Sequence, residues 1–395
     1  MTDASLPVHH VLIIGAGISG LLLAQGLKQA GMRFSIFETE PSATAERPRE
    51  WTMAVHWALP MIDELLPEDL RKRVLTTQPD PEYVVNMDDK TKFFHGVTGE
   101  LLTELPSLGA RRLRRRALRE LCSEGIDIQY GKTLSDIVYT DTGVVAQFTD
   151  GTEAQGSLIV GTDGPRSKTR ALLVGEAAAE VSSSGKILCS ATSSYTASQA
   201  EYLREQVPFM RPALHPNGSF YVIFPQDVSD PNPEAWTFQV MHSSMPYDFV
   251  GDNAARMKLF KERATLVAEP WKSCIEWLPD STRVYFDNQV YWKSIPFDTR
   301  AGRATLAGDA AHPMTPQRGQ GFNHAVCDVY NLVAELKKMH TEGLSLEGAV
   351  DAYTGEMVKR GGDEVEAALL NTQMVHDWDR AMQSPLFTKS WTRQN

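Results

Sequence analysis

Near the N-terminus, the apolar and polar positions follow the order strand, helix, strand. Residues 11–14 form a short apolar run, the segment LLLAQGLKQAG after Gly20 has helical spacing, and residues 34–37 form a second apolar run. Short apolar runs bounded by turn residues are typical of buried strands, and apolar spacing of three and four is typical of a helix. This order predicts a βαβ unit of Rossmann type and an α/β fold.

Further along, the pattern predicts a second sheet and a helical end. Short strands are expected at 126–130, 144–148 and 157–160. Between 188 and 286, aromatic residues alternate with polar ones in longer strands, which favours a sheet that walls an apolar pocket. Residues 346–382 have helical spacing and mixed charge, and are expected to form a closing cap.

The segment 111–121 contains six arginines and an apolar stripe. It predicts an amphipathic basic helix whose arginines are mostly solvated, with one of them reaching a ligand. A nucleic-acid patch is the competing interpretation. The net charge of -11 and the pI near 5.4 argue against it, because binding to polyanions needs an excess of Lys and Arg.

Composition adds few further constraints. The 395 residues are 42% apolar and 23% charged, as in a soluble globular protein. The four cysteines are far apart and show no CxxC or Cys/His spacing, so reduced thiols and no metal site are expected. Glycines interrupt the run 11–27, which argues against a signal peptide or a membrane span. The sequence predicts a cytoplasmic enzyme, monomeric or homodimeric.

The glycines after the first strand form the sequence GxGxxG. Gly15 permits a tight turn, Gly17 lets the backbone approach a pyrophosphate, and Gly20 lets the helix pack on the strand. Glu38 follows the second strand, where a carboxylate can accept the hydroxyls of an adenosine ribose. Strand, glycine loop, helix and acid together predict a dinucleotide site.

Two later stretches have the same strand-to-loop character. The apolar run before Asp163 and Gly164 leads into a loop, and the run before Gly308 and Asp309 leads into a Pro- and Gly-rich turn. A helix is expected to begin at 321–323, where free N–H groups favour an anion or an electron-rich oxygen. Asp309 is a candidate acceptor for a ribityl or ribose hydroxyl.

With these three motifs in this order, the chain resembles the single-component FAD-dependent aromatic monooxygenases, the para-hydroxybenzoate hydroxylase-like family. The resemblance extends over roughly residues 8 to 345. It implies that FAD lies extended across the three motifs, and that Arg115, three residues before Leu118, contacts it. The residues expected to bind FAD are Gly15, Gly17, Ser19, Gly20, Glu38, Arg49, Arg115, Asp163, Gly164, Gly308, Asp309, Pro316, Gly319, Gly321, Phe322 and Asn323.

The resemblance also implies a division of the chain. A discontinuous Rossmann-like FAD-binding domain is expected to be interleaved with a substrate-binding β-sheet domain and followed by a C-terminal helical segment. The expected boundaries are 1–75, 100–180 and 285–345 for the FAD-binding domain, 76–99 and 181–284 for the β-sheet domain, and 346–395 for the cap.

The implied chemistry is oxygen transfer. NADPH or NADH docks transiently and reduces the flavin, O2 adds at C4a, and the terminal oxygen of the hydroperoxide passes to an electron-rich carbon. The dense aromatics favour a bulky aromatic or alkene-bearing substrate, such as a secondary metabolite, so hydroxylation and epoxidation both stay open. The candidates for substrate acid–base work are His56, Arg211, His215 and Tyr221.

Three alternatives remain open. A flavin-dependent halogenase shares the fold, but residues 291–296 keep only the Ile and Pro of its WxWxIP segment and lose both motif tryptophans. A reductase or oxidase of the same fold would transfer no oxygen. A non-enzymatic FAD-fold protein would bind without turnover, and the three intact motifs argue against it.

Overall fold

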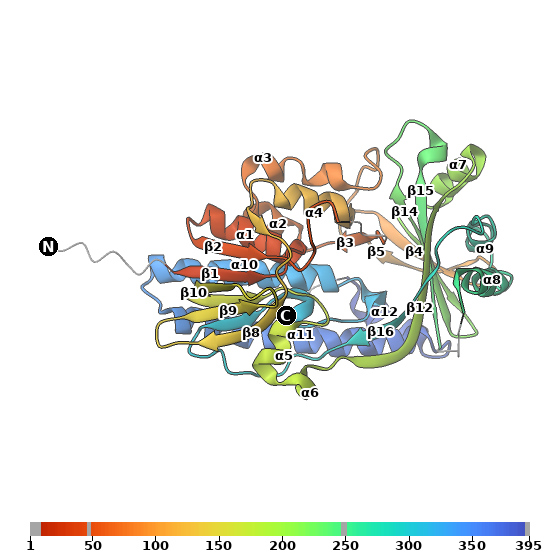
Figure 1. Ribbon diagram of the computed structural model, residues 1–395. Helices are drawn as coiled ribbons and strands as arrows, with labels where there is room; N and C mark the ends of the chain where they lie inside the picture. Colours follow the sequence, from red (N-terminus) through yellow and green to blue (C-terminus); the bar gives the residue numbers. More distant parts are fainter. Residues whose placement is uncertain (1–8, 46–48, 246–250, 392–395) are drawn as a thin grey trace.

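The computed structural model describes residues 9–45, 49–245 and 251–391. Two sheets lie at opposite ends of the molecule in Figure 1, a parallel one near the N-terminal strand and a larger, mostly antiparallel one beside the helices α7, α8 and α9. The predicted α/β class, with a Rossmann-like unit and a separate sheet, is confirmed.

The first sheet is built as the strand–helix–strand pattern predicts. Its neighbouring strands pair in parallel, and its core is continuous with the apolar faces of the helices packed on it. In spatial order its strands are β17 (Ala304–Leu306), β11 (Leu158–Gly161), β1 (His10–Ile14), β2 (Arg33–Phe37) and β7 (Ile128–Gln129). A three-stranded sheet accompanies it, in the order β10 (Glu153–Gly156), β9 (Val144–Phe148) and β8 (Leu134–Tyr139).

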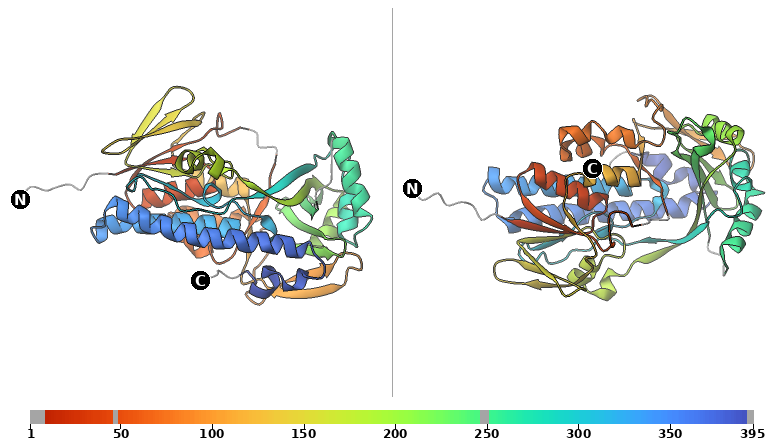
Figure 2. Two further views of the ribbon diagram at one scale, coloured as in Figure 1. Left: turned by 90° about the horizontal axis from the view of Figure 1, so that it is seen from below. Right: turned by 45° about the horizontal axis from the view of Figure 1, so that its top comes forward.

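Long helices cover the first sheet and reach toward the second. The helix α10 packs on α1, α2 and α11, and the left view of Figure 2 shows α10 and α11 running along the molecule. The helices of this part are α1 (Ile18–Gln29), α2 (Leu59–Leu65), α3 (Glu68–Arg71), α4 (Arg115–Ser123), α5 (Lys168–Val174), α6 (Glu176–Ala179), α10 (Gly321–Thr341) and α11 (Leu346–Val375). The short helix α12 (Pro385–Lys389) packs against the second sheet.

The second sheet has seven strands and an apolar core on each face. The helices α7 (Ala197–Gln206), α8 (Asn253–Ala264) and α9 (Trp271–Glu276) cover its back face. In spatial order its strands are β16 (Tyr285–Tyr291), β12 (Ser182–Ser194), β15 (Thr237–Ser244), β14 (Ser219–Asp227), β13 (Arg211–His215), β4 (Lys90–His95) and β5 (Leu101–Pro106). Strands β5 and β16 thus belong to this sheet, although the predicted boundaries give both segments to the FAD-binding domain.

The basic segment differs from its prediction. Instead of one helix, Arg111–Arg114 is the strand β6, which pairs antiparallel with β3 (Thr52–Val55), and the helix α4 begins only at Arg115. Strand alternation sends Arg112 into the interior with 8% of its surface exposed. The expectation of mostly solvated arginines is therefore wrong for Arg112.

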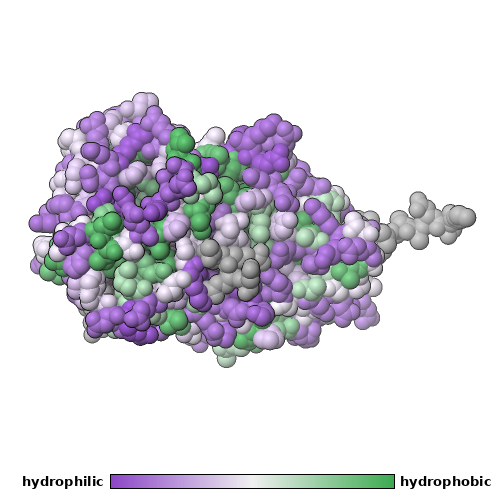
Figure 3. All heavy atoms as spheres, turned by 180° about the vertical axis from the view of Figure 1, so that it is seen from behind, coloured by the Kyte–Doolittle hydropathy of each residue, from purple (hydrophilic) through white to green (hydrophobic). Residues whose placement is uncertain are grey.

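The remaining general features concern the surface and the cysteines. Hydrophilic side chains cover most of the face in Figure 3, with hydrophobic patches between them. Among the described residues, no helix has both the length and the apolar character needed to cross a bilayer. The four cysteines are buried and form no disulfide.

Candidate active site

The three sequence motifs meet at one edge of the parallel sheet. Phe37, Ile14, Gly161 and Leu306 are Cα partners across neighbouring strands, so the loops that follow them leave the sheet side by side. In open parallel sheets, ligands bind beyond the carboxyl ends of the strands. Segments far apart in the sequence therefore build one cradle.

The glycines of the first loop have two different roles. A Cβ on Gly15 would lie 2.7 Å from the carbonyl oxygen of Thr162, and one on Gly20 would lie 2.0 Å from that of Gly15, so both permit close packing. Gly17 has no heavy atom within 4 Å of such a Cβ and borders the cavity described below. It also stands at the N-cap of α1, which no side chain caps. Gly17 thus leaves room where an anion would contact the helix start.

Two predicted acidic residues hold backbone inside the protein. Glu38 accepts hydrogen bonds from the amides of Ala16 (2.8 Å) and Glu40 (3.0 Å). Asp163 accepts from the hydroxyl of Ser167 (2.5 Å) and from the amide of Thr169 (3.0 Å). Neither carboxylate borders the cavity, whereas Gly164 does. The contacts of Glu38 and Asp163 with FAD stay predictions. In this structure the two carboxylates hold the loops of the cradle in shape.

Unlike Glu38 and Asp163, Asp309 directs its carboxylate into the cavity. It lies in the short helix η3 (Gly308–Ala310), and its side chain opens into the cavity. Its carboxylate has no hydrogen-bond partner among the described residues. Removal from bulk water raises the pKa of Asp309, although His312 and Arg115 act to lower it. Arg115, at the start of α4, borders the same cavity and stacks over Trp51 at 4.5 Å.

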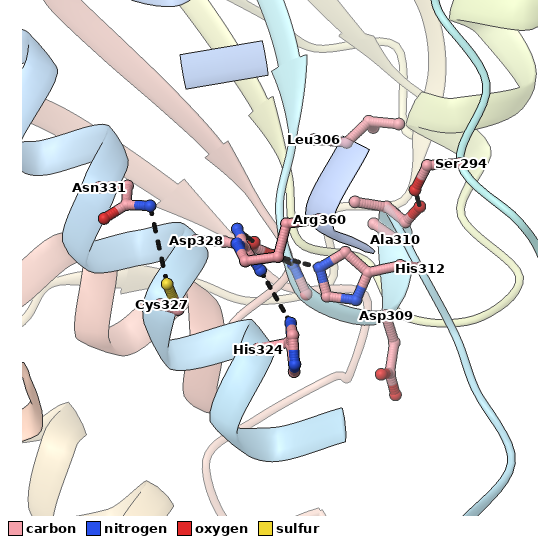
Figure 4. A network of polar contacts seen from close by, with 12 residues as sticks. Ser294, Leu306, Asp309, Ala310, His312, His324, Cys327, Asp328, Asn331 and Arg360 are labelled. Carbon is pink, nitrogen blue, oxygen red and sulfur yellow. Dashed lines mark hydrogen bonds and ion pairs between the residues drawn. The ribbon is translucent and has the colours of Figure 1, made fainter. Parts of the chain in front are cut away.

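A buried polar network supports the loop from behind. Asp328 accepts hydrogen bonds from the amide of Gly308 (2.7 Å), from Nε2 of His312 (2.6 Å) and from Nη2 of Arg360 (2.7 Å). Figure 4 shows these side chains converging between α10 and α11, while the carboxylate of Asp309 points away from them. Burial tends to raise the pKa of Asp328, but His312 and Arg360 lower it to about 2. The network therefore fixes the backbone that presents Asp309.

The start of α10 forms the next part of the wall. Gly321 and Phe322 border the cavity, as do Pro316 and Gly319 from the short helix η4 (Pro316–Arg318) and its end. No side chain caps the N-terminus of α10. Asn323 turns away from the cavity and accepts a hydrogen bond from the amide of His56 at 2.8 Å. Its predicted contact with FAD therefore stays a prediction, and its observed role is to hold the loop after β3.

One large cavity joins this cradle to the seven-stranded sheet. Its volume is about 670 Å³, within the range of pockets that bind drug-sized ligands. The motif loops line one end. The other end is lined by the front face of the second sheet, mainly Phe220, Val222, Phe224 and Met241. The cavity therefore has a polar, glycine-rich end and an apolar, aromatic end.

Three of the four predicted acid–base residues lie on the back face of that sheet, away from the cavity. Phe220 and Phe224 on β14 face the cavity, so the intervening Tyr221 points to the back face, where its ring stacks on His242 at 4.5 Å. Arg211 lies over Phe94 at 4.0 Å on the same back face, and His215 contacts the carbonyl of Leu266 at 2.8 Å. None of the three lines the cavity.

His56 does line the cavity. It follows β3, and its ring stacks on Trp391 with centroids 5.3 Å apart and planes 11° apart. Neither imidazole nitrogen has a hydrogen-bond partner of normal geometry among the described residues. Burial, together with the nearby cation of Arg112, lowers the pKa of His56 to about 4. The imidazole is therefore neutral at physiological pH.

Several cavity residues have no signal in the sequence. Arg112 belongs to an arginine run that looks solvated, Gln239 lies in an ordinary strand, and Trp391 comes long after the last motif. The carbonyl of Trp391 accepts a hydrogen bond from Gln320 at 3.3 Å, which seats the C-terminal segment against the α10 loop. Only alternation along β6 would have suggested an inward Arg112.

Arg49 has a protein partner near the second sheet. Its guanidinium pairs with Asp287 at 2.5 Å and donates to the hydroxyl of Ser190 at 3.2 Å. Both Arg49 and Asp287 border the cavity. A contact of Arg49 with FAD thus stays a prediction, and in the structure this residue links the loop before β3 to β12 and β16.

The residues fit an extended, anionic dinucleotide such as FAD. The open space at Gly17, the uncapped starts of α1 and α10, and the unpartnered carboxylate of Asp309 all face one cavity. Helix starts favour a pyrophosphate, and a free carboxylate accepts hydroxyl hydrogens. Gly17 and Ser19 would hold the pyrophosphate, Asp309 the ribityl chain, and the 316–322 loop the flavin edge.

Comparison with known proteins agrees with this fit. A family model described as an FAD binding domain matches residues 9–243 and 289–368. The FAD-dependent monooxygenase phnB of Penicillium herquei is 40% identical over 395 residues, covering 98% of this chain and 95% of phnB. The FAD-dependent monooxygenase cctM of Talaromyces islandicus is 34% identical, covering 96% of each chain.

Solved structures show the same fold. Klebsiella pneumoniae HpxO, complexed with FAD and uric acid, superposes with a TM-score of 0.77 at 20% identity, covering 99% of this chain and 93% of HpxO. The family match extends over well more than half of the chain, and the two relatives extend over nearly all of it. The chain therefore belongs to the FAD-dependent monooxygenases, and it is an oxidoreductase with FAD as its cofactor.

Proposed function

We propose that this monooxygenase uses NADPH or NADH and O2 to hydroxylate or epoxidise a bulky aromatic or alkene-bearing substrate, such as a secondary metabolite. The observation that carries the proposal is the single cavity of about 670 Å³ in which the FAD cradle opens onto the aromatic face of the second sheet. A cofactor held by the cradle and a substrate held by the sheet would share this one cavity.

The chain's own residues position the reacting groups and exclude water from them. When bound, FAD supplies the redox chemistry, taking electrons from the nicotinamide nucleotide and activating O2 for transfer. The start of α10 places about half a positive charge at the end of the cradle, which favours negative charge on a group held there. Phe220, Val222 and Phe224 keep water from the substrate end, and water exclusion suppresses side reactions.

The lining of the cavity also supports the expected substrate class. Its sheet end is lined mainly by aromatic and aliphatic side chains, which match the flat apolar surface of an aromatic or polyene substrate. Polar side chains also line it, among them Arg112, Gln239 and Ser243. Of the four predicted acid–base residues, only His56 lines the cavity, which supports His56 alone as a candidate.

Isotope-labelled O2 provides the test of oxygen transfer. Purified enzyme with FAD, NADPH and a panel of polycyclic phenols and alkenes should give a product that carries one labelled oxygen atom, checked by mass spectrometry. Nucleotide consumption that yields only hydrogen peroxide or unlabelled product would contradict the proposal and favour a reductase or oxidase. Product formation that requires chloride would point to a halogenase.

Replacing Asp309 by Ala should weaken FAD binding without unfolding the protein. The carboxylate has no partner among the described residues, so its loss breaks no protein contact. Loss of a hydrogen bond to a charged group, worth about 1.5–3 kcal/mol, corresponds to roughly a 10- to 150-fold weaker affinity. FAD titration of flavin-free protein measures this, and Asp309→Asn should fall between Ala and wild type. Unchanged affinity in Asp309→Ala would remove Asp309 from the FAD site.

A further inference from the structure

Arg112 is a buried cation that has no carboxylate partner among the described residues. It has 8% of its surface exposed and borders the cavity. Its Nε donates to the hydroxyl of Thr52 at 2.7 Å and its Nη2 to the carbonyl of Thr52 at 3.0 Å. Its Nη1 donates no hydrogen bond within the described part of the chain. Both known partners are neutral, so the guanidinium charge is uncompensated.

The guanidinium is held in a fixed position. It lies over the ring of Phe224 with 3.8 Å between Cζ and the ring centroid, and the two hydrogen bonds to Thr52 tie it to β3. Stacking and hydrogen bonding from two directions leave an arginine little rotamer freedom. A guanidinium fixed in this way is preorganised for a ligand, because the entropic cost of ordering it is already met.

Two further side chains at the cavity have buried polar atoms that are free to bind a ligand. Both ring nitrogens of His56 and the Oε1 of Gln239 have no hydrogen-bond partner of normal geometry in the described part of the chain, while the Nε2 of Gln239 donates to the carbonyl of Glu50 at 3.4 Å. Gln239 is the direct cross-strand neighbour of Phe224, so it lies beside the ring on which Arg112 stacks. The charge of Arg112 also acts on His56. The three side chains therefore form one polar group beside the aromatic part of the cavity wall.

The charge of this group is positive. Burial lowers the pKa of Arg112 to about 9, so the guanidinium stays protonated at neutral pH, while His56 is neutral. A buried charge without a partner is costly, and proteins pair such charges or use them. An uncharged apolar substrate would leave the cost in place. An oxyanion of the substrate would remove it and would also accept the Nη1 hydrogens.

We propose that Arg112, together with His56 and Gln239, forms a subsite that binds an anionic oxygen of the substrate. That oxygen belongs to a phenolate, an enolate or a carboxylate. The subsite thus selects acidic aromatic molecules among those that the cavity admits by shape. This inference rests on the proposed function, because it takes the sheet end of the cavity as the substrate site.

The test uses three probes on the oxidised FAD-bound enzyme. 4-Nitro-1-naphthol is an anion at neutral pH, its methyl ether has nearly the same shape without charge, and 1-naphthoate carries a carboxylate. Affinities are measured by isothermal titration calorimetry, because the yellow naphtholate absorbs where the flavin does. Wild type should bind the naphtholate about 10- to 100-fold more tightly than the ether. The ratio of naphtholate to naphthoate affinity tells which source of the oxyanion the subsite prefers.

Variants then assign the preference to Arg112. Arg112→Met should remove most of the naphtholate preference and change the ether affinity less than about threefold, and Arg112→Lys should restore part of it. Arg111→Met is the matched control, since Arg111 lies on the same strand, does not border the cavity and donates to Gln78 at 3.0 Å. Flavin content and circular dichroism show whether each variant is folded.

Two results would overturn the subsite. The first is that the wild-type enzyme binds the naphtholate no better than the ether. This result needs no variant protein. The other is a folded Arg112→Met that loses affinity for both probes equally, as a purely structural arginine would. Because the assay needs no turnover, its failure is separate from a failure of oxygen transfer, which the labelled-O2 experiment detects.

Discussion

Gly17→Val should give a folded protein that does not retain FAD. The backbone of Gly17 has a φ of -71°, which valine adopts, and no heavy atom lies within 4 Å of the added Cβ. We propose that in the FAD-bound protein the pyrophosphate occupies that space. Displacing it from the start of α1 removes at least two hydrogen bonds to a charged group, worth about 1.5–3 kcal/mol each, or roughly two to four factors of ten in affinity.

Two other glycines serve as controls for this prediction. Gly355 lies on the exposed face of α11 with nothing within 4 Å, so Gly355→Val adds the same side chain away from the cavity and should keep its flavin. Gly20→Val meets the carbonyl of Gly15 and should lose both flavin and fold. Flavin absorbance per protein and circular dichroism separate the three cases. Wild-type flavin content in Gly17→Val would place the pyrophosphate elsewhere.

Asp328→Ala should destabilise the protein strongly and also weaken FAD binding. Asp328 is fully buried and is the shared acceptor for Gly308, His312 and Arg360. Removing one partner of a buried ion pair costs about 3–5 kcal/mol. We expect the lower end of this range, because Arg360 keeps Glu356 at 2.6 Å. The amide of Gly308 loses its acceptor, so the loop that presents Asp309 is no longer fixed.

Urea unfolding of the flavin-free protein and FAD titration measure the two effects of Asp328→Ala. The double variant Asp328→Leu/Arg360→Met removes both charges and should recover part of the stability. Asp363→Asn breaks an exposed pair with Lys359 on α11 and should leave the unfolding midpoint unchanged. A flavin-free Asp328→Ala as stable as wild type would show that the network does not hold the loop.

The sequence predicted the parts whose chemistry depends on local spacing. Gly15, Gly17 and Gly20 follow one strand, and each motif loop comes directly after an apolar run, so the parallel pairing of these runs brought them together. Which side chains of a strand face the cavity could not be predicted in the same way. Tyr221 and Phe220 are adjacent in β14, and the apolar run 220–225 shows no alternation that tells which of them meets the cavity.

Residues without a local motif were also missed. Arg112 has arginines for neighbours, but it is more deeply buried than they are. This difference in burial arises only because β6 pairs with β3. Trp391 reaches the cavity by the folding back of α12 against the second sheet, a contact that no spacing indicates. The resemblance assigns Asn323 to the cofactor, and this contact stays a prediction; its amide donates to the carbonyls of Ala54 and Gly319.

The parallel sheet also constrains the order in which the protein becomes functional during synthesis. Its neighbouring strands β1, β11 and β17 lie far apart in the chain, and the edge strand β17 ends at Leu306. Such long-range pairing is slow, because distant segments must meet before any contact is gained. A nascent or truncated chain that stops before β17 lacks the strand that presents Asp309. Yellow colour in a preparation therefore reports that synthesis has passed this point and that the distant strands have paired.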